Sequence, residues 1–354
     1  MMKLIALVTL GALPVCALTL SPVGELPIPA ETATGMPPMG LSGITYAGDD
    51  RWYAMKDTAG LLYPLTIGLD RASGAVTNCT LGAPVTLRPV PSRYKRDFED
   101  VAWDAAVRCV WASDECDASI RAFSPDTGTE LAAVAIPPVF DAFRFNRSFE
   151  ALSLRANGFE LWTCNEEALC SRETSDRQPK DVAPMTVAPE VDDGPRATAK
   201  NGSVVRLQKF TRPAFNQPWV PAGQWAYETD TIGGRSFIGK SRCGVAGLCV
   251  LDDGTVLALE RELSVKSAMM PSFRCRIYQI DFTGATDTSA IMSLKGADVK
   301  KVAKRRVFSA NTGFAMYEGI ALGPVLVDGS RSVLLISDGD DGAVTRLYAL
   351  KLTP

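Results

Sequence analysis

The sequence contains no histidine in 354 residues. This absence excludes nucleophilic triads and dyads that use histidine as the base, and it excludes histidine-ligated zinc or iron. A metal would have to be bound by oxygen ligands, which favours calcium, with magnesium as the less favoured ion. Acid–base chemistry would fall to carboxylates, lysine, tyrosine or metal-bound water.

An excess of charge of one sign is also missing. The chain has 37 Lys and Arg against 40 Asp and Glu, a formal net charge of -3. No strong basic field is available, so we expect no nucleic-acid partner. Beyond the N-terminus no apolar run is long enough to cross a bilayer, so we expect a mature protein without a membrane span.

The N-terminus has the pattern of a secretory signal peptide. Lys3 precedes the apolar run Leu4–Leu13, and Val15, Cys16 and Ala17 follow. A charged start, a short apolar stretch and a small residue at the cleavage point predict a signal peptide over residues 1–17, cleaved after Ala17. The protein is therefore expected to be secreted or periplasmic. Lipidation of Cys16 is the alternative, which the bulky Val15 disfavours.

The eight cysteines that follow residue 17 predict disulfides, because an even number in an exported protein indicates bridges. No pair has the C-x-x-C spacing of a zinc site. A stapling role is expected, with the connectivity open. The pairs close in sequence are Cys109 and Cys116, Cys164 and Cys170, and Cys243 and Cys249.

Five segments of the chain repeat one pattern, two short apolar strands around a turn that end in polar residues. Turn dipeptides such as Asn157-Gly158 and Asp253-Gly254 accept positive φ and are typical of two-residue hairpins. The paired stretches are Leu41–Tyr46 with Met55–Asp57, Phe98–Trp103 with Ser113–Glu115, Phe149–Leu154 with Cys164–Glu166, Val245–Val250 with Leu259–Arg261, and Tyr317–Leu322 with Ile336–Asp338.

This repetition predicts an all-β, single-domain β-propeller, since about four strands per ~50 residues is the rhythm of a blade. The gap between Glu150 and Ala246 is about two repeats long, so we expect a blade without the pattern that includes Trp225–Glu228. Six blades follow, with seven as the alternative. The expected organisation is an extension or first outer strand over residues 18–39 and a propeller over 40–354, with an insertion loop at about 173–199. Ordinary hairpins in a β-sandwich or a large barrel are the competing interpretation.

Radial blades would bring the polar strand ends to one central site, because the two ends of a hairpin lie at the same edge of a sheet. Carboxylates cannot gather there unless a cation or basic residues offset their charge. The alternative is that each acid only caps local backbone N–H groups. The expected metal ligands are Asp57, Glu99, Asp114, Glu115, Glu150, Glu166, Glu260, Glu318 and Asp338. The expected catalytic residues are Glu99, Glu150, Glu318 and Arg261. The basic residues expected to bind an anionic substrate are Lys56, Arg144 and Arg147.

The same residues resemble the secreted bacterial phytase-like family, described as "esterase-like activity of phytase". The resemblance runs from about Gly40 to the C-terminus and is carried by the stretches Leu41–Ile44, Asp97–Asp100, Ser113–Glu115, Asn146–Glu150, Leu259–Arg261 and Tyr317–Ile320. It implies a β-propeller and phosphoester hydrolysis outside the cytoplasm. It also adds Asn146 to the expected substrate-binding residues. The family's usual Asp-Asn ending is replaced here by Asp338-Gly339-Asp340-Asp341, which leaves the ligand at that position open.

Three functions remain open from the sequence. The first is metal-assisted hydrolysis of a small anionic or ester substrate, phosphoesters above all, with calcium polarising the phosphoryl group. The second is a binding propeller in which calcium and the acids serve only structure. The third is a lactonase-like propeller hydrolase. Whether the protein is an enzyme at all is undecided at this stage, because one fold serves many functions.

Overall fold

The structure is a computed structural model that describes most of the chain. The described residues are 18–31, 38–57, 60–88, 96–142, 147–171, 190–233, 241–265, 271–339 and 344–354. The expected signal peptide, Arg144, Asn146 and residues 172–189 of the expected insertion loop lie outside them.

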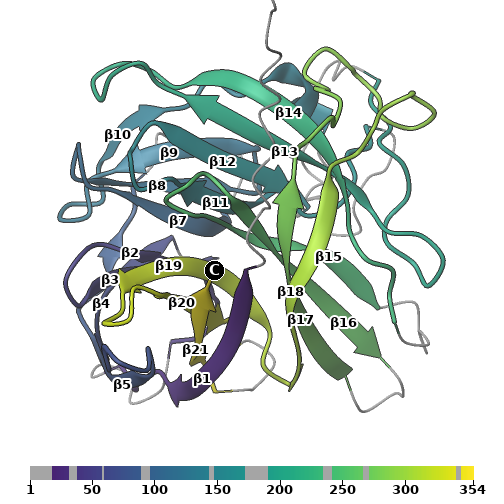
Figure 1. Ribbon diagram of the computed structural model, residues 1–354. Coiled ribbons are helices and arrows are strands. Elements are labelled where there is room, and N and C mark those ends of the chain that lie inside the picture. Colours follow the sequence, from purple (N-terminus) through teal and green to yellow (C-terminus); the bar gives the residue numbers. More distant parts are fainter. Residues whose placement is uncertain are drawn as a thin grey trace, which may run out of the picture.

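Five antiparallel sheets surround a central axis in the described part of the chain (Figure 1). Apart from these strands it contains one short 3-10 helix, Pro138–Ala142. In chain order, and from the axis outward, the first sheet is β2 (Leu41–Tyr46), β3 (Arg51–Lys56), β4 (Leu61–Leu69) and β5 (Val76–Leu81), with β6 (Val85–Thr86) beside β4. The second is β7 (Phe98–Asp104), β8 (Cys109–Asp114), β9 (Ser119–Phe123) and β10 (Glu130–Ala133). The third is β11 (Phe149–Leu154), β12 (Glu160–Asn165), β13 (Val204–Thr211) and β14 (Val220–Glu228). The fourth is β15 (Arg242–Val250), β16 (Val256–Val265), β17 (Pro271–Asp281) and β18 (Ala303–Gly313). The fifth is β19 (Tyr317–Val325), β20 (Arg331–Ser337), β21 (Arg346–Thr353) and β1 (Thr19–Pro27).

The predicted all-β propeller is confirmed, but the favoured count of six blades is corrected to five in the described residues. The inner strands β2, β7, β11, β15 and β19 contact one another in this order, and β19 contacts β2 to close the ring. The extra blade was inferred from the long gap after Glu150. That gap is filled by the connection from β12 to β13, and Trp225 lies on β14 of the same sheet.

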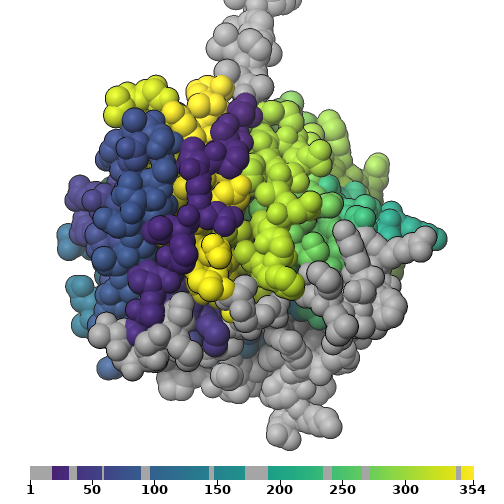
Figure 2. Space-filling model, turned by 90° about the horizontal axis from the view of Figure 1, so that it is seen from below, coloured from purple at the N-terminus to yellow at the C-terminus, as the bar shows by residue number. Residues whose placement is uncertain are grey.

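The two ends of the chain are joined in the fifth sheet. Strand β1 pairs antiparallel with β21, from Thr19 opposite Thr353 to Pro27 opposite Arg346. Figure 2 shows the purple β1 lying along the yellow C-terminal strand, between the neighbouring sheets. Because the outermost strand comes from the start of the chain, the ring closes only when both ends have been brought together.

Apolar side chains fill the spaces between adjacent sheets. Five large buried clusters occupy these spaces in the described residues, one at each interface. Phe140 and Phe149 pack with ring centroids 4.8 Å apart between the second and third sheets. Burial on both faces of each sheet explains the long apolar stretches in the repeats. The described residues contain no helix long and apolar enough to span a membrane.

The structure corrects the disulfide prediction, because all eight cysteines after residue 17 are free thiols. Cys243 and Cys249 lie on the same strand, β15. A strand rises ~3.3 Å per residue, which places these two residues roughly 20 Å apart. A disulfide needs Cα atoms within about 7 Å. Two cysteines on one extended strand are therefore too far apart to form a disulfide, even when they are close in sequence. The burial of seven of the eight shows that they pack as small apolar residues.

Candidate functional site

Each inner strand has a β-bulge, close to its start in four sheets and in the middle of β15, and the repeat pattern of the sequence places its key residue there. A bulge leaves a residue out of the pairing ladder and redirects its side chain. Three of the bulges carry a glutamate. The bulged residues are Ser42, Glu99 with Asp100, Glu150, Ala246 and Glu318.

A second ring of equivalent positions follows the end of the hairpin. The residues at these positions are Asp57, Glu115, Glu166, Arg261 and Asp338. In four sheets the backbone N–H at this position donates at 2.9 Å to a carbonyl just before the inner strand, as Glu115 donates to Asp97 and Glu166 to Ser148. In the fourth sheet the ladder continues, and Arg261 lies inside β16 opposite Gly244. The two rings thus place acids of different sheets at one mouth of the central channel.

Two groups of three carboxylates form at this mouth. Asp97, Glu99 and Glu115 each offer an oxygen within 4.8 Å of the others, and so do Glu115, Glu150 and Glu166. Glu115 belongs to both groups and is fully buried. Its Oε1 accepts a hydrogen bond from the Ser148 N–H at 3.2 Å, whereas its buried Oε2 meets no N–H or hydroxyl donor among the described residues. A buried carboxylate oxygen without a partner is costly, and a cation would supply one.

Two arginines neutralise one side of the site. Arg147 Nη1 lies 2.6 Å from Glu166 Oε2, and Arg261 Nη2 lies 2.5 Å from Glu166 Oε1. Arg261 also contacts Glu318, and its Nη2 lies 3.5 Å from Glu150 Oε1. Both oxygens of Glu166 are therefore taken by guanidinium groups, which makes Glu166 a poor metal ligand.

The acids respond to burial and to one another. Burial, followed by the charges of Glu150 and Glu115, raises the pKa of Glu99, and burial with Glu150 and Glu166 raises that of Glu115. Burial and Glu166 raise the pKa of Glu150 to about 8. Burial opposes ionisation of Glu166 as well, but Arg147 and Arg261 outweigh it and lower the pKa. At neutral pH the site must therefore hold protons or a cation.

The metal-free protein is expected to lose stability as the pH rises from about 4.5 to 8. Folded Glu150 keeps its proton up to about pH 8, whereas an exposed glutamate loses it near 4.5. Its contribution is therefore complete below pH 4.5 and is lost as the pH rises through about 8. Melting temperatures measured in chelator should fall across this range, and the fall should be smaller for Glu150→Gln. Equal slopes for the two proteins would contradict the assignment to Glu150.

Other expected site residues lie beside the two groups. Asp114 turns away from the channel to an ion pair with Arg96 at 3.0 Å, and burial raises its pKa to about 6. Lys56 and Asp57 are half-buried at the end of β3, and the charge of Asp57 contributes to the raised pKa of Glu99. Asp338 is buried, and its carbonyl accepts the Gly40 N–H at 2.8 Å, which links the fifth sheet to the first.

Glu260 is a correction, because its carboxylate faces away from both groups. It accepts hydrogen bonds from the Tyr227 hydroxyl at 2.6 Å and the Asp230 N–H at 2.9 Å, and it pairs with Lys304 at 2.5 Å. Successive residues of a strand point to opposite faces, so Glu260 cannot face the channel when Arg261 does.

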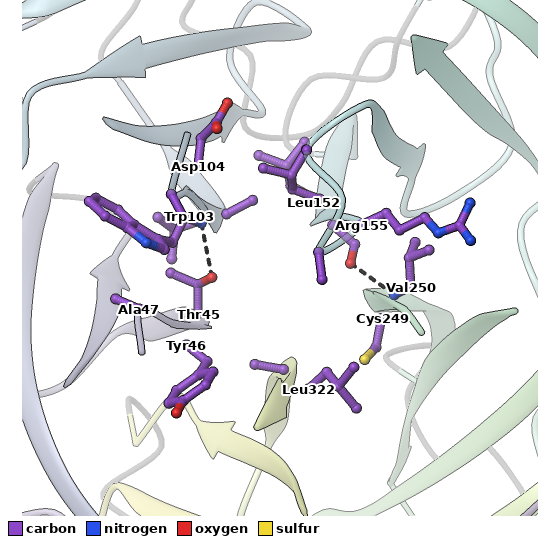
Figure 3. Close-up of a pocket in the computed structure, with 18 of the residues that line it drawn as sticks. Thr45, Tyr46, Ala47, Trp103, Asp104, Leu152, Arg155, Cys249, Val250 and Leu322 are labelled. Atoms are coloured by element: carbon purple, nitrogen blue, oxygen red, sulfur yellow. Dashed lines mark hydrogen bonds between the residues drawn. The ribbon is translucent and has the colours of Figure 1, made fainter. Parts of the chain in front are cut away.

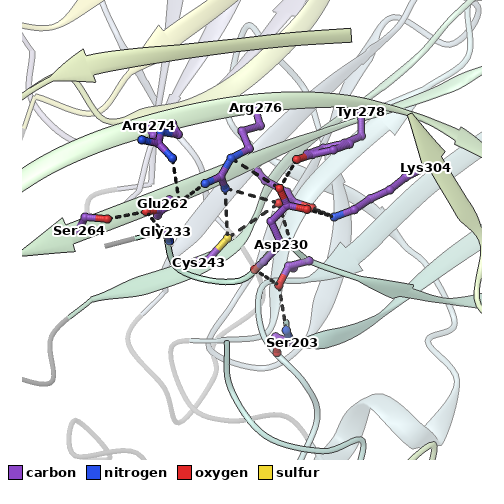
Figure 4. Close-up of polar contacts among 12 residues, drawn as sticks. Ser203, Asp230, Gly233, Cys243, Glu262, Ser264, Arg274, Arg276, Tyr278 and Lys304 are labelled. Carbon is purple, nitrogen blue, oxygen red and sulfur yellow. Dashed lines mark hydrogen bonds and ion pairs between the residues drawn. The ribbon is translucent and has the colours of Figure 1, made fainter. Parts of the chain in front are cut away.

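Glu260 belongs to a network of polar contacts between the third and fourth sheets. Figure 4 shows Asp230, Glu262, Arg276 and Lys304 of this network. Arg276 pairs with Glu262 there, and Lys304 pairs with Asp230 at 2.9 Å. Glu262 also accepts the Gly233 N–H at 3.0 Å. These acids have basic partners and hydrogen-bond donors, so they hold the third and fourth sheets together.

Asp97 is the site residue that the sequence argument missed. It precedes β7 by one residue and completes the group with Glu99 and Glu115. A signal existed in the repeats. In four sheets the residue just before the inner strand accepts a backbone hydrogen bond from the second-ring residue, as Asp97 does from Glu115 and Ser148 from Glu166. The Ser148 N–H also donates to the Glu115 carboxylate.

A cavity of about 520 Å³ opens at the other end of the channel, where the inner strands finish. Leu152, Val250 and Leu322 are among its lining residues (Figure 3). Its polar side chains already serve neighbouring sheets, since Thr45 Oγ1 accepts the Trp103 N–H at 3.0 Å. None of the five clustered acids lines this cavity. The channel therefore has one mouth with converging acids, the charged mouth, and a second mouth with a mixed polar and apolar lining.

Comparison with solved structures finds similar chains at low identity. The PQQ-bound aldose sugar dehydrogenase of Streptomyces coelicolor is 12% identical, with a TM-score of 0.44, over 95% of this chain and 99% of that one. A streptogramin B lyase is 11% identical, with a TM-score of 0.33, over 95% and 97%. The hydrazine synthase of Kuenenia stuttgartiensis is 11% identical, with a TM-score of 0.34, over 86% of this chain, which spans only 57% of that one.

No curated protein matches the chain significantly. A family model does match, and it covers residues 37–341, which include both rings of the charged mouth. Its description is "Phytase-like: Esterase-like activity of phytase". Because this match covers most of the chain, the protein belongs to the phytase-like family of β-propellers.

Proposed function

We propose that the protein is an extracytoplasmic hydrolase that cleaves phosphoesters with the help of a calcium ion bound at the charged mouth. The observation that carries the proposal is Glu115 Oε2, a buried oxygen that no N–H or hydroxyl donor reaches in the described part of the chain, in a carboxylate shared by two acidic groups. The family description, which names an esterase-like activity, supports ester chemistry.

The residues present fit a hard cation. Asp97, Glu99 and Glu115 would hold it, because their oxygens converge and the two groups found among the described residues consist of carboxylates alone. Calcium accepts six to eight oxygens in irregular geometry, whereas magnesium requires an octahedron that this uneven set does not favour. When bound, the ion would polarise the phosphoryl group and lower the pKa of a coordinated water.

The chain's own groups would do the remaining work. Arg147 and Arg261 fix Glu166 through both of its oxygens and hold Glu150 beside it. Glu150 lies outside the group of Asp97, Glu99 and Glu115, and burial with the charge of Glu166 raises its pKa, so it would carry the proton that the leaving alkoxide needs. Half-buried Lys56, at the end of β3, would attract the anionic substrate.

Hydrolysis is expected to depend on calcium. Protein stripped with chelator should cleave nitrophenyl phosphate and phytate at least ~10-fold more slowly than the same protein with calcium restored, because charge on the phosphoryl oxygens would lose its main stabiliser. Magnesium should restore less activity than calcium. The control is Asp252→Asn, an exposed acid at the far side of the molecule, which should respond as the wild type does. Activity that is unchanged by chelator, or absent on every phosphoester, would refute the proposal.

A non-catalytic, calcium-stabilised propeller is the second candidate, and burial favours it. Glu115, Glu166 and Glu150 are 0%, 1% and 5% exposed, which limits the approach of a substrate. This candidate predicts a melting temperature that rises with calcium while no ester is cleaved. Lactone substrates in the same assays would identify a lactonase-like hydrolase.

A further inference from the structure

Arg261 occupies an unusual place in the second ring. The other four positions of this ring all carry acids, and Arg261 is its single basic residue. The four acids are Asp57, Glu115, Glu166 and Asp338. Its side chain is 15% exposed. A guanidinium group therefore occupies the position at which the other four sheets have an acid.

Three carboxylates from two other sheets converge on this one guanidinium group. Its Nη2 lies 2.5 Å from Glu166 Oε1 and 3.5 Å from Glu150 Oε1, and its Nη1 contacts Glu318 Oε1. A cation surrounded by oxygens of several chain segments is the arrangement of a metal site. Here the cation is part of the chain.

The two halves of the mouth are compensated differently. In the half with Arg261, Glu166 has both oxygens in ion pairs. In the half with Asp97 and Glu99, no N–H or hydroxyl donor of the described residues reaches Glu115 Oε2. Within the described ranges, the five acids of the two groups and Glu318 outnumber the guanidinium groups of Arg147 and Arg261 that pair with them, which favours an external cation.

We propose that Arg261 is a built-in cation that takes the place of a second metal ion, so that calcium binds only in the half formed by Asp97, Glu99 and Glu115. The inference rests on the cation site of the proposed function, which it extends by assigning the position and number of bound ions. Replacing Arg261 with an uncharged residue would convert Glu150, Glu166 and Glu318 into a second calcium site.

Calorimetric titration of calcium chloride into chelator-stripped full-length protein tests this. Arg261→Gln should bind about one more ion per chain than the wild type. Arg261→Lys, which keeps the charge, should bind the same number as the wild type. Arg346→Gln, an exposed arginine on β21 with Glu25 at 3.7 Å, is the matched control and should also bind the wild-type number. The double variant Arg261→Gln with Glu318→Gln should lose the additional ion.

Folding gives a second readout that does not depend on activity. Arg261→Gln should melt well below the wild type in chelator and recover most of the difference in calcium, because the ion replaces the missing charge. An unchanged number of ions, or a variant that stays unfolded in calcium, would overturn the inference. A wild type that binds ions without cleaving esters would defeat the proposed hydrolysis alone, and a gain of one ion by Arg261→Gln would stand even then.

Discussion

An Arg206→Met variant is expected to lose about 3–5 kcal/mol of unfolding free energy, because removing one partner of a buried ion pair leaves the other charge uncompensated. Arg206 lies on β13 and is fully buried. Its Nε and Nη2 donate to the two oxygens of Asp193 at 2.6 and 2.7 Å. Its remaining N–H groups reach the Gln224 side chain and the carbonyls of Ile291 and Met292.

This arginine joins three distant parts of the chain, so its loss affects more than one contact. Asp193 belongs to the connection between β12 and β13, and residues 291–292 belong to the connection between β17 and β18. Denaturant titration followed by fluorescence measures the effect. Arg206→Met with Asp193→Asn should be less destabilised than the sum of the two single changes, since the pair is removed together. A single-variant loss below about 1 kcal/mol would show that the network contributes little.

Glu115→Gln is expected to abolish the response to calcium and to stabilise the metal-free protein. The change removes one of several buried negative charges, and burial with Glu150 and Glu166 already raises the pKa of this group. The new amide can also donate a hydrogen bond to a neighbouring carboxylate. Melting temperature in chelator should therefore rise, by an amount that reflects about 1–3 kcal/mol, while the increase caused by calcium disappears. Ester hydrolysis should fall at least ~100-fold.

The matched control is Glu262→Gln, a carboxylate buried to a similar degree between the third and fourth sheets. Glu262 pairs with Arg276, so its neutralisation should lower stability and leave the calcium response intact. Opposite signs for the two variants in chelator would separate a cation site from a structural ion pair. If Glu115→Gln also lowers the melting temperature in chelator, Glu115 serves structure and the cation site is wrong.

Repetition of short-range patterns made the fold and much of the site predictable. The glutamates at 99, 150 and 318 recur at one position of the hairpin, and that position coincides with a bulge in every inner strand. The blade count was less accessible, because a long connection inside the third sheet looks, in sequence, like a blade without its pattern. The orientation of Glu260 was missed because adjacent residues of a strand, such as Glu260 and Arg261, point to opposite faces of the sheet. Only the pairing register decides which of the two faces the channel.

The sequence by itself determined much of the chemistry that is available: the lack of histidine excludes imidazole ligands and bases, and four of the five repeated hairpins carry acids at their ends. Only the tertiary structure decided which acids converge in groups of three and which are already paired with arginines. Glu166 and Glu115 occupy equivalent places in their repeats, yet Arg147 and Arg261 pair with the first, while an oxygen of the second meets no N–H or hydroxyl donor in the residues that the structure describes. The reason is physical, because the free energy of a buried charge depends on neighbours that lie far away in the chain.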